Sequence, residues 1–105
     1  MKVFQGAEVI WGDAPRPREK LPADQQVRFL HDLVKRLVLS IAEREDEVRV
    51  VVYDVPPRVG FTVRVHHSDI GLVLGEKGAT VNAIRRIVWT AAKKTDYQVD
   101  IDLCG

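Results

Sequence analysis

The sequence has one cysteine, little net charge and no long apolar run, and each of these shortages argues against a class of protein. Its 105 residues include one cysteine, Cys104, so no intramolecular disulfide can form and an intracellular setting is favoured. Net charge is only +1, which argues against a protein that coats nucleic acid by bulk electrostatics. No apolar run resembles a signal peptide or could span a bilayer. We therefore expect a cytoplasmic protein that does not bind a membrane.

The composition favours one ordinary globular domain. Hydrophobic residues make up 46% of the chain and charged residues 30%, and this length suffices for a modest core. Residues 1–24 read as an N-terminal arm and linker, in which Lys2–Trp11 is a candidate extra strand or apolar latch. We expect the domain itself over residues 25–105, with its first helix beginning at Pro22 or Asp24.

The spacing of apolar residues predicts a mixture of helices and strands. Intervals of three and four predict amphipathic helices, and alternation predicts half-buried strands. The expected elements are a helix over 24–43, strands over 47–54 and 60–66, a short helix over 69–74, a longer helix over 79–94 and a strand over 97–103. Pro56 and Pro57 should separate the first two strands, because neither can donate to a sheet ladder.

The stretch around Gly75 and Gly78 is the most informative part of the chain. These glycines bracket Glu76 and Lys77, and an apolar, helix-compatible segment lies on each side. Glycine permits left-handed backbone angles and lets a ligand come close to the main chain. The first N–H groups of the second helix lack intrahelical partners, which suits a phosphate. The spacing therefore predicts a tight turn between two helices that a ligand approaches closely.

Basic charge is concentrated at the same stretch. From Lys77 to Lys94 there are five basic residues and no acidic ones, whereas residues 43–47 are mostly acidic. A local site for phosphate groups requires such a concentration of basic residues, although a solvated helix face would show the same pattern. Glu76 repels phosphate from within the turn, so we expect binding to be modest in affinity and sensitive to salt.

Val73–Val81, with Asp69–Gly71 and Ala83–Arg85 beside it, resembles the helix–GXXG–helix core of the KH-domain family. In that family the loop clamps four nucleotides of single-stranded nucleic acid. The expected element order is similar to the type II KH fold, an α+β fold in which three helices cover one face of a three-stranded sheet. The chain resembles the small bacterial single-KH proteins of the KhpA type. This resemblance implies a non-enzymatic RNA-binding protein, an RNA chaperone or post-transcriptional regulator, that pairs with a second KH-containing protein or with itself.

The resemblance also implies which residues bind single-stranded RNA. Carried over position by position, they are Ile70, Gly71, Leu74, Gly75, Glu76, Lys77, Gly78, Val81 and Arg85. The four residues of the GXXG turn would clamp the backbone, and Lys77 and Arg85 would donate to phosphates. For Leu74 and Val81 the alternative role is core packing. For Gly71 the alternative is close packing of its helix on the sheet.

The aromatic residues favour no single function. Phe61 and Tyr97 fall in strands, outside any motif that resembles a stacking platform of the RRM kind. Trp89 lies in the longer helix, and we hypothesise that it forms a dimer or partner patch; otherwise it covers the rim of the core. The corresponding alternative function is a protein–protein interaction module that keeps the KH scaffold without significant RNA binding.

Other chemistries are poorly supported by the sequence. The segment from Gly71 to Lys77 superficially resembles a P-loop, but its glycine spacing is one residue short and no Ser or Thr follows the lysine. His66, His67 and Asp69 are the one cluster of metal-ligand types, yet neighbouring strand residues point to opposite faces. We identify no catalytic constellation and expect no metal and no cofactor.

Overall fold

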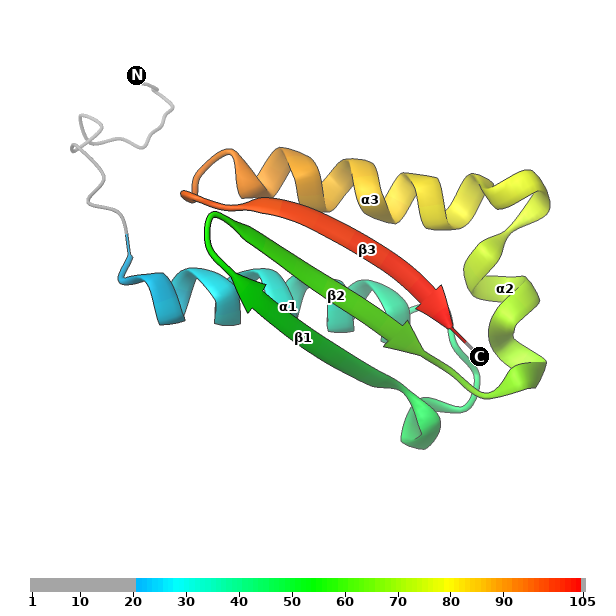
Figure 1. The fold of residues 1–105 in the computed structure, drawn as a ribbon. Helices are drawn as coiled ribbons and strands as arrows, with labels where there is room; N and C mark the ends of the chain where they lie inside the picture. The colour runs from blue at the N-terminus through cyan, green and yellow to red at the C-terminus, as the bar shows by residue number, and fades with distance from the viewer. Residues whose placement is uncertain (1–20, 105) are drawn as a thin grey trace, which may run out of the picture.

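The structure, a computed structural model, describes residues 21–104 (Figure 1). Its elements are α1 (Ala23–Leu39), β1 (Arg49–Val55), β2 (Arg58–Arg64), α2 (Ile70–Leu74), α3 (Ala79–Ala92) and β3 (Gln98–Cys104). This element order and the α+β class are confirmed. The predicted strand or latch over Lys2–Trp11 lies outside the described residues. Within residues 21–104, no helix is long and apolar enough to cross a membrane.

The strands form one mixed sheet in the order β1–β2–β3. β1 and β2 pair antiparallel across the turn Pro56–Pro57, so the prolines separate the two strands as predicted. β2 and β3 pair in parallel, with Phe61 opposite Ile101. A parallel pair needs a long crossover connection. Here α2 and α3 make that crossover, which brings α3 alongside β3 (Figure 1).

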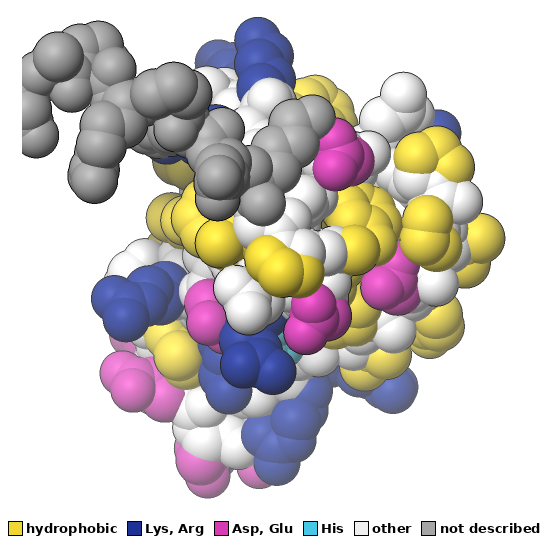
Figure 2. All heavy atoms as spheres, turned by 90° about the vertical axis from the view of Figure 1, so that its left-hand side faces the viewer, with side chains coloured by type: hydrophobic (Ala, Val, Ile, Leu, Met, Phe, Trp, Pro, Cys, Tyr) yellow, Lys and Arg dark blue, Asp and Glu magenta, His cyan; other side chains and the backbone are white. Residues whose placement is uncertain are grey.

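One face of the sheet is left uncovered by the described helices. On this face β1 displays Tyr53 and Val55, whose exposed fractions are 58% and 70%. Arg58 of β2 and Asp100 of β3 also lie there and form an exposed ion pair of 2.8 Å. Figure 2 views the molecule from the end where the β1–β2 turn lies and shows hydrophobic side chains with acidic ones between them.

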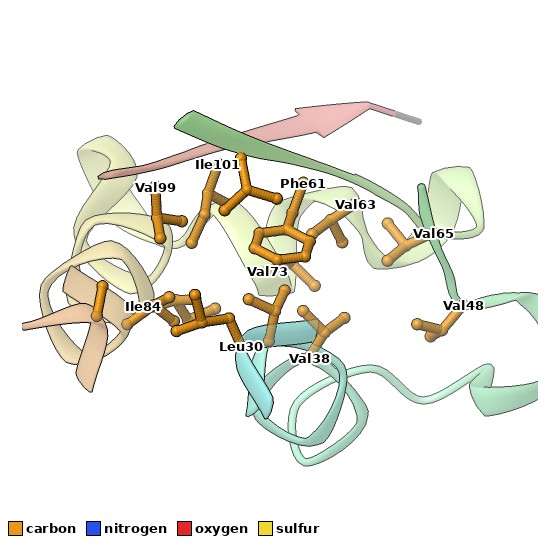
Figure 3. Close-up of a cluster of buried hydrophobic side chains, with 14 of the residues drawn as sticks. Leu30, Val38, Val48, Phe61, Val63, Val65, Val73, Ile84, Val99 and Ile101 are labelled. Carbon is orange, nitrogen blue, oxygen red and sulfur yellow. The ribbon is translucent and has the colours of Figure 1, made fainter. Parts of the chain in front are cut away.

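The core lies between the other face of the sheet and the three helices (Figure 3). Along β2 the side chains alternate as predicted, so Phe61 and Val63 are buried while Arg64 is exposed. The helices contribute Leu30, Val34 and Val38 from α1, Val73 from α2, and Ile84 and Val88 from α3. This packing fixes α2 and α3, and therefore the loop between them, against a rigid sheet.

Helix α1 begins after Pro22, as predicted, but ends at Leu39 rather than near Glu43. The Ser40 hydroxyl donates to the Leu37 carbonyl oxygen at 2.6 Å, which gives the last turn an alternative to further helix. The acidic run that follows would also place negative charge at the helix C-terminus, where the macrodipole disfavours it. The chain turns here instead, and Ala42 is buried in the core.

Gln26 fixes the connection between α3 and β3. It is buried, and its Oε1 atom accepts from the Asp96 N–H at 2.9 Å while its Nε2 atom donates to the Leu21 carbonyl at 2.7 Å. In the same connection, the Thr95 hydroxyl donates to the Ala92 carbonyl at 2.7 Å. These bonds explain why α3 ends at Ala92 and not at Lys94, as its periodicity alone would allow.

Candidate nucleic-acid interface

The turn between α2 and α3 has a backbone conformation that residues other than glycine rarely adopt. Gly75 and Gly78 have φ angles of 76° and 77°, and Lys77 between them has a φ of 56°. A Cβ atom on Gly75 would overlap the Thr80 hydroxyl and lie 2.6 Å from the Thr80 nitrogen. Glycine is therefore required at position 75 by both conformation and space. This is the tight turn that the sequence predicted.

The turn lies at the surface. Glu76 and Lys77 are exposed, and both glycines are partly exposed. The first turn of α3 contains no acidic residue, and no side chain caps its N-terminus. A phosphate at this position would meet backbone N–H groups, the positive end of the helix dipole and the Lys77 ammonium.

The four expected RNA-binding residues that are apolar or glycine and lie outside the turn, Ile70, Gly71, Leu74 and Val81, lie in different environments. Gly71 is exposed, and a Cβ placed on it would have no other atom within 4 Å, so close packing on the sheet does not explain it. Leu74 is 41% exposed, and its role is therefore not core packing. Ile70 is partly buried against the core. Val81, in the first turn of α3, is only 5% exposed and is therefore buried.

Arg85 faces the edge strand of the sheet. Its Nε and Nη2 atoms donate to the Ile101 carbonyl at 3.1 and 3.0 Å, and its Nη1 atom donates to Asn82 Oδ1 at 2.9 Å. Arg85 therefore bridges α3 and β3. A guanidinium group carries five N–H donors, and two remain after these three bonds. Asn82 was not among the predicted site residues, although its spacing of three residues from Arg85 places both on one helix face.

The candidate metal-ligand cluster has other partners. His66 Nδ1 lies 2.7 Å from the Ser68 hydroxyl and accepts from the Ser68 N–H at 3.1 Å. Asp69 is buried and accepts from the Arg44 N–H at 2.9 Å. Among residues 21–104, no group of three or more His, Cys, Asp or Glu side chains could hold a metal ion.

Comparison with known proteins places most of the chain in one family. The protein-family model described as "KhpA/KhpB, KH domain" matches residues 31–103. "RNA-binding protein KhpA" of Bacillus subtilis is 30% identical over 76 residues, which cover 72% of this chain and 94% of that protein. "RNA-binding protein KhpA" of Leifsonia xyli is 35% identical over 73 residues, which cover 70% of this chain and 96% of that protein.

A solved structure shows the same fold at much lower identity. It is the crystal structure of Era in complex with MgGDPNP and nucleotides 1506–1542 of 16S ribosomal RNA, with a TM-score of 0.61 and 11% identity. The likeness covers 85% of this chain but only 36% of the Era chain, so it concerns the fold alone. The match over residues 31–103 and the identity to the two KhpA proteins show that the chain belongs to the KhpA/KhpB KH-domain family.

Proposed function

We propose that the chain is a cytoplasmic, non-enzymatic protein that binds single-stranded RNA at the Gly75–Gly78 turn and acts as an RNA chaperone or post-transcriptional regulator. The observation that carries the proposal is the exposed turn ahead of an uncapped helix, in which Gly75, Lys77 and Gly78 all have positive φ angles. The names of its KhpA relatives, which describe RNA-binding proteins, support the choice of ligand. In this proposal residues 25–105 form the binding domain and residues 1–24 an arm.

The proposed contacts divide into backbone and base contacts. The turn and Lys77 would hold phosphates, while Gly71 and Leu74 line the approach for bases. The two remaining N–H donors of Arg85 would contact the same RNA strand in the space between α3 and β3. With two or three phosphates neutralised, the logarithm of the binding constant should fall with the logarithm of salt concentration with a slope of about −1.5 to −2. Affinity should be modest because Glu76 repels the same phosphates.

The test is a double substitution, Glu76→Asp with Lys77→Asp, in the full-length protein. It removes one cation from the turn and should reduce the magnitude of the salt slope by about 1. Fluorescence anisotropy with labelled single-stranded RNA measures both the affinity and the slope. Lys35→Asp is the matched control, because Lys35 is also exposed but lies on α1, away from the turn.

The proposal requires the double variant to bind RNA more weakly than both the wild type and the Lys35→Asp control. Equal affinities for all three proteins at low salt would show that the turn is not the phosphate site. In that case the chain is better described as a protein–protein interaction module on a KH scaffold.

We further propose that the chain associates with a second KH-containing protein or with a second copy of itself. A hollow of about 440 Å³ on the outer surface of α3 is lined by Ala83, Arg86, Ile87 and Thr90. Ile87 is 48% exposed there. An exposed aliphatic side chain in a shallow hollow is suited to contact with another protein. Light scattering of wild type and Ile87→Asp would test self-association, and an identical molar mass for a dimeric wild type and the variant would contradict it.

A further inference from the structure

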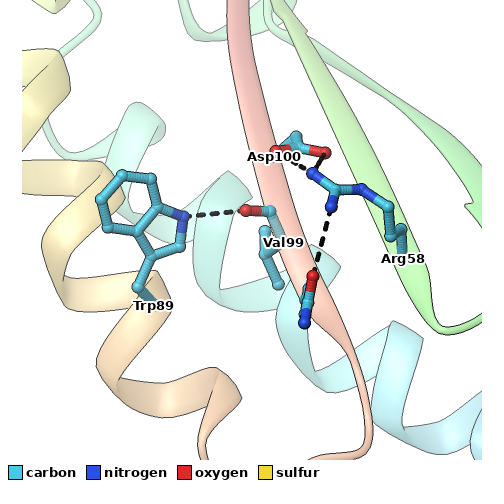
Figure 4. A network of polar contacts seen from close by, with 5 residues as sticks. Arg58, Trp89, Val99 and Asp100 are labelled. Carbon is cyan, nitrogen blue, oxygen red and sulfur yellow. Dashed lines mark hydrogen bonds and ion pairs between the residues drawn. The ribbon is translucent and has the colours of Figure 1, made fainter.

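Trp89 is held in a fixed orientation at the surface. The indole Nε1 atom donates to the Val99 carbonyl at 2.8 Å, so the side chain extends from α3 to the edge of β3 (Figure 4). Despite this bond the residue is 49% exposed. By contrast Phe61 and Tyr97 are buried. An aromatic ring that is both oriented and half in solvent can offer a face to a planar ligand.

Trp89 lies on the same side of α3 as Arg85, farther from the Gly75–Gly78 turn. The Gln98 N–H donates to the Pro57 carbonyl, so the backbone groups of Gln98 point toward β2. In this parallel pair the backbone groups of Val99 and Ile101 therefore point toward the free edge of β3. Arg85 and Trp89, one helical turn apart on α3, bond to Ile101 and Val99 respectively. These two side chains therefore both extend from the helix to the free edge of the sheet. At 1.5 Å per residue, Trp89 lies about 15 Å along α3 from its first residue.

A cleft adjoins the indole. Its volume is about 510 Å³, and its lining includes Trp89, Lys93, Val99 and Asp96. This volume lies within the range of small-ligand sites. Lys93 is exposed and follows Trp89 by one helical turn. The Asp96 carboxylate accepts from buried Gln26 at 3.3 Å, which holds this acidic group toward α1.

We propose that Trp89 stacks on a base of a single-stranded RNA that extends beyond the nucleotides held at the Gly75–Gly78 turn, and that Lys93 contacts the adjoining phosphate. The inference rests on the proposed function and adds a second contact point to it. The occupant is a nucleobase because the cleft combines a flat aromatic face with a nearby cation, and because Trp89 lies one helical turn beyond Arg85 along the same edge between α3 and β3. Stacking on an indole tolerates any base, since every base has a π-face.

Affinity for RNA of two lengths tests the proposal. Random-sequence pools of four and eight nucleotides are titrated with wild-type protein, Trp89→Ala and Trp89→Phe. Loss of the indole should weaken binding of the eight-nucleotide pool by about 5-fold to 140-fold. The four-nucleotide pool, held at the turn, should bind equally well to all three proteins. Trp89→Phe keeps a ring and should lose less affinity than Trp89→Ala.

Tryptophan emission provides a readout that does not depend on a variant at position 89. The chain has two tryptophans, so Trp11→Phe leaves Trp89 as the one reporter. Base stacking should quench this emission when the eight-nucleotide pool saturates the protein. An unchanged emission at saturation, or a folded Trp89→Ala variant that binds both pools like the wild type, would overturn the proposal. An equal loss of affinity for the two pools would also overturn it.

The outcomes separate this inference from the function on which it rests. If wild-type protein binds neither pool, the proposed RNA binding fails and the role of Trp89 fails with it. If wild type binds both pools and Trp89→Ala does too, only the role of Trp89 fails. A Trp89→Ala variant with unchanged RNA affinity but a lower molar mass in light scattering would assign this surface to a second copy of the chain.

Discussion

Replacing the glycines of the turn one at a time should separate backbone strain from steric overlap. Gly75 has a φ of 76° and a ψ of 170°, a region that is nearly exclusive to glycine and costs other residues about 1–3 kcal/mol. A Cβ atom there would also lie 2.6 Å from the Thr80 nitrogen, a backbone atom that cannot move without shifting the start of α3. Relieving such overlap costs a further 1–3 kcal/mol or so. We therefore expect Gly75→Ala to lower the free energy of unfolding by about 2–6 kcal/mol.

Gly78→Ala should cost much less. Its φ of 77° and ψ of 14° are left-handed helical angles, which cost an L-residue about 1–2 kcal/mol. The nearest atom to an added Cβ would be Asn82 Nδ2 at 3.6 Å, so no overlap arises. Alanine also restricts the unfolded chain, which returns about 0.4–1 kcal/mol. The net loss should be about 1 kcal/mol.

Urea unfolding followed by circular dichroism measures both losses, and Gly71→Ala is the control. Gly71 lies in α2 without a positive φ, and an added Cβ would meet no atom within 4 Å beyond its chain neighbours and its own helix backbone, so alanine there should be neutral or stabilise by up to about 1 kcal/mol. For a domain of this size, 1 kcal/mol corresponds to about 4–8 °C in melting temperature. Equal losses at positions 75 and 78 would refute the steric argument, and a marked loss in the control would refute the account of the whole turn.

Three further substitutions test other contacts. Gln26→Ala should cost about 1–3 kcal/mol, because it removes the side chain that bonds to the Leu21 carbonyl and the Asp96 N–H, and hydrogen exchange should accelerate first in the connection between α3 and β3. Burial, and then the nearby Asp54 carboxylate, raise the pKa of Tyr97 above its ordinary value. The folded state therefore holds this proton more tightly, so stability should fall as pH rises past about 10, and Asp54→Asn should shift the Tyr97 absorbance titration to lower pH. Breaking the exposed Arg58–Asp100 pair with Asp100→Asn should cost at most about 1 kcal/mol, and a larger loss measured in high salt would contradict its exposure.

The elements could be predicted because their patterns are local. Alternation along β2 fixed which side chains are buried, and the glycine spacing located the tight turn. Helix ends were less accurate: α1 stops four residues early because the Ser40 hydroxyl and the following acids compete with the helix, a balance that periodicity does not record. The parallel register of β3 was also beyond local pattern, since nothing in one strand specifies its partner.

The site residues show the same division. The turn depends on the conformational range of glycine, which the sequence displays directly. Val81 and Leu74 look alike as apolar helix residues, yet one is buried and the other is not, because only the packing of α2 against α3 distinguishes them. Arg85 and Trp89 bond to carbonyls of β3, the strand that follows α3. That arrangement requires the assembled sheet and could not be read from residue spacing.

The parallel pairing of β2 with β3 has a consequence for how the domain is made in the cell. A nascent chain that stops before Gln98 has no partner for one side of β2, and Val99 and Ile101 are missing from the interior. Pairing between strands so distant in sequence is entropically slow. Cooperative folding must therefore wait until the last strand has left the ribosome, and until then the apolar side of α3 has no strand to cover it.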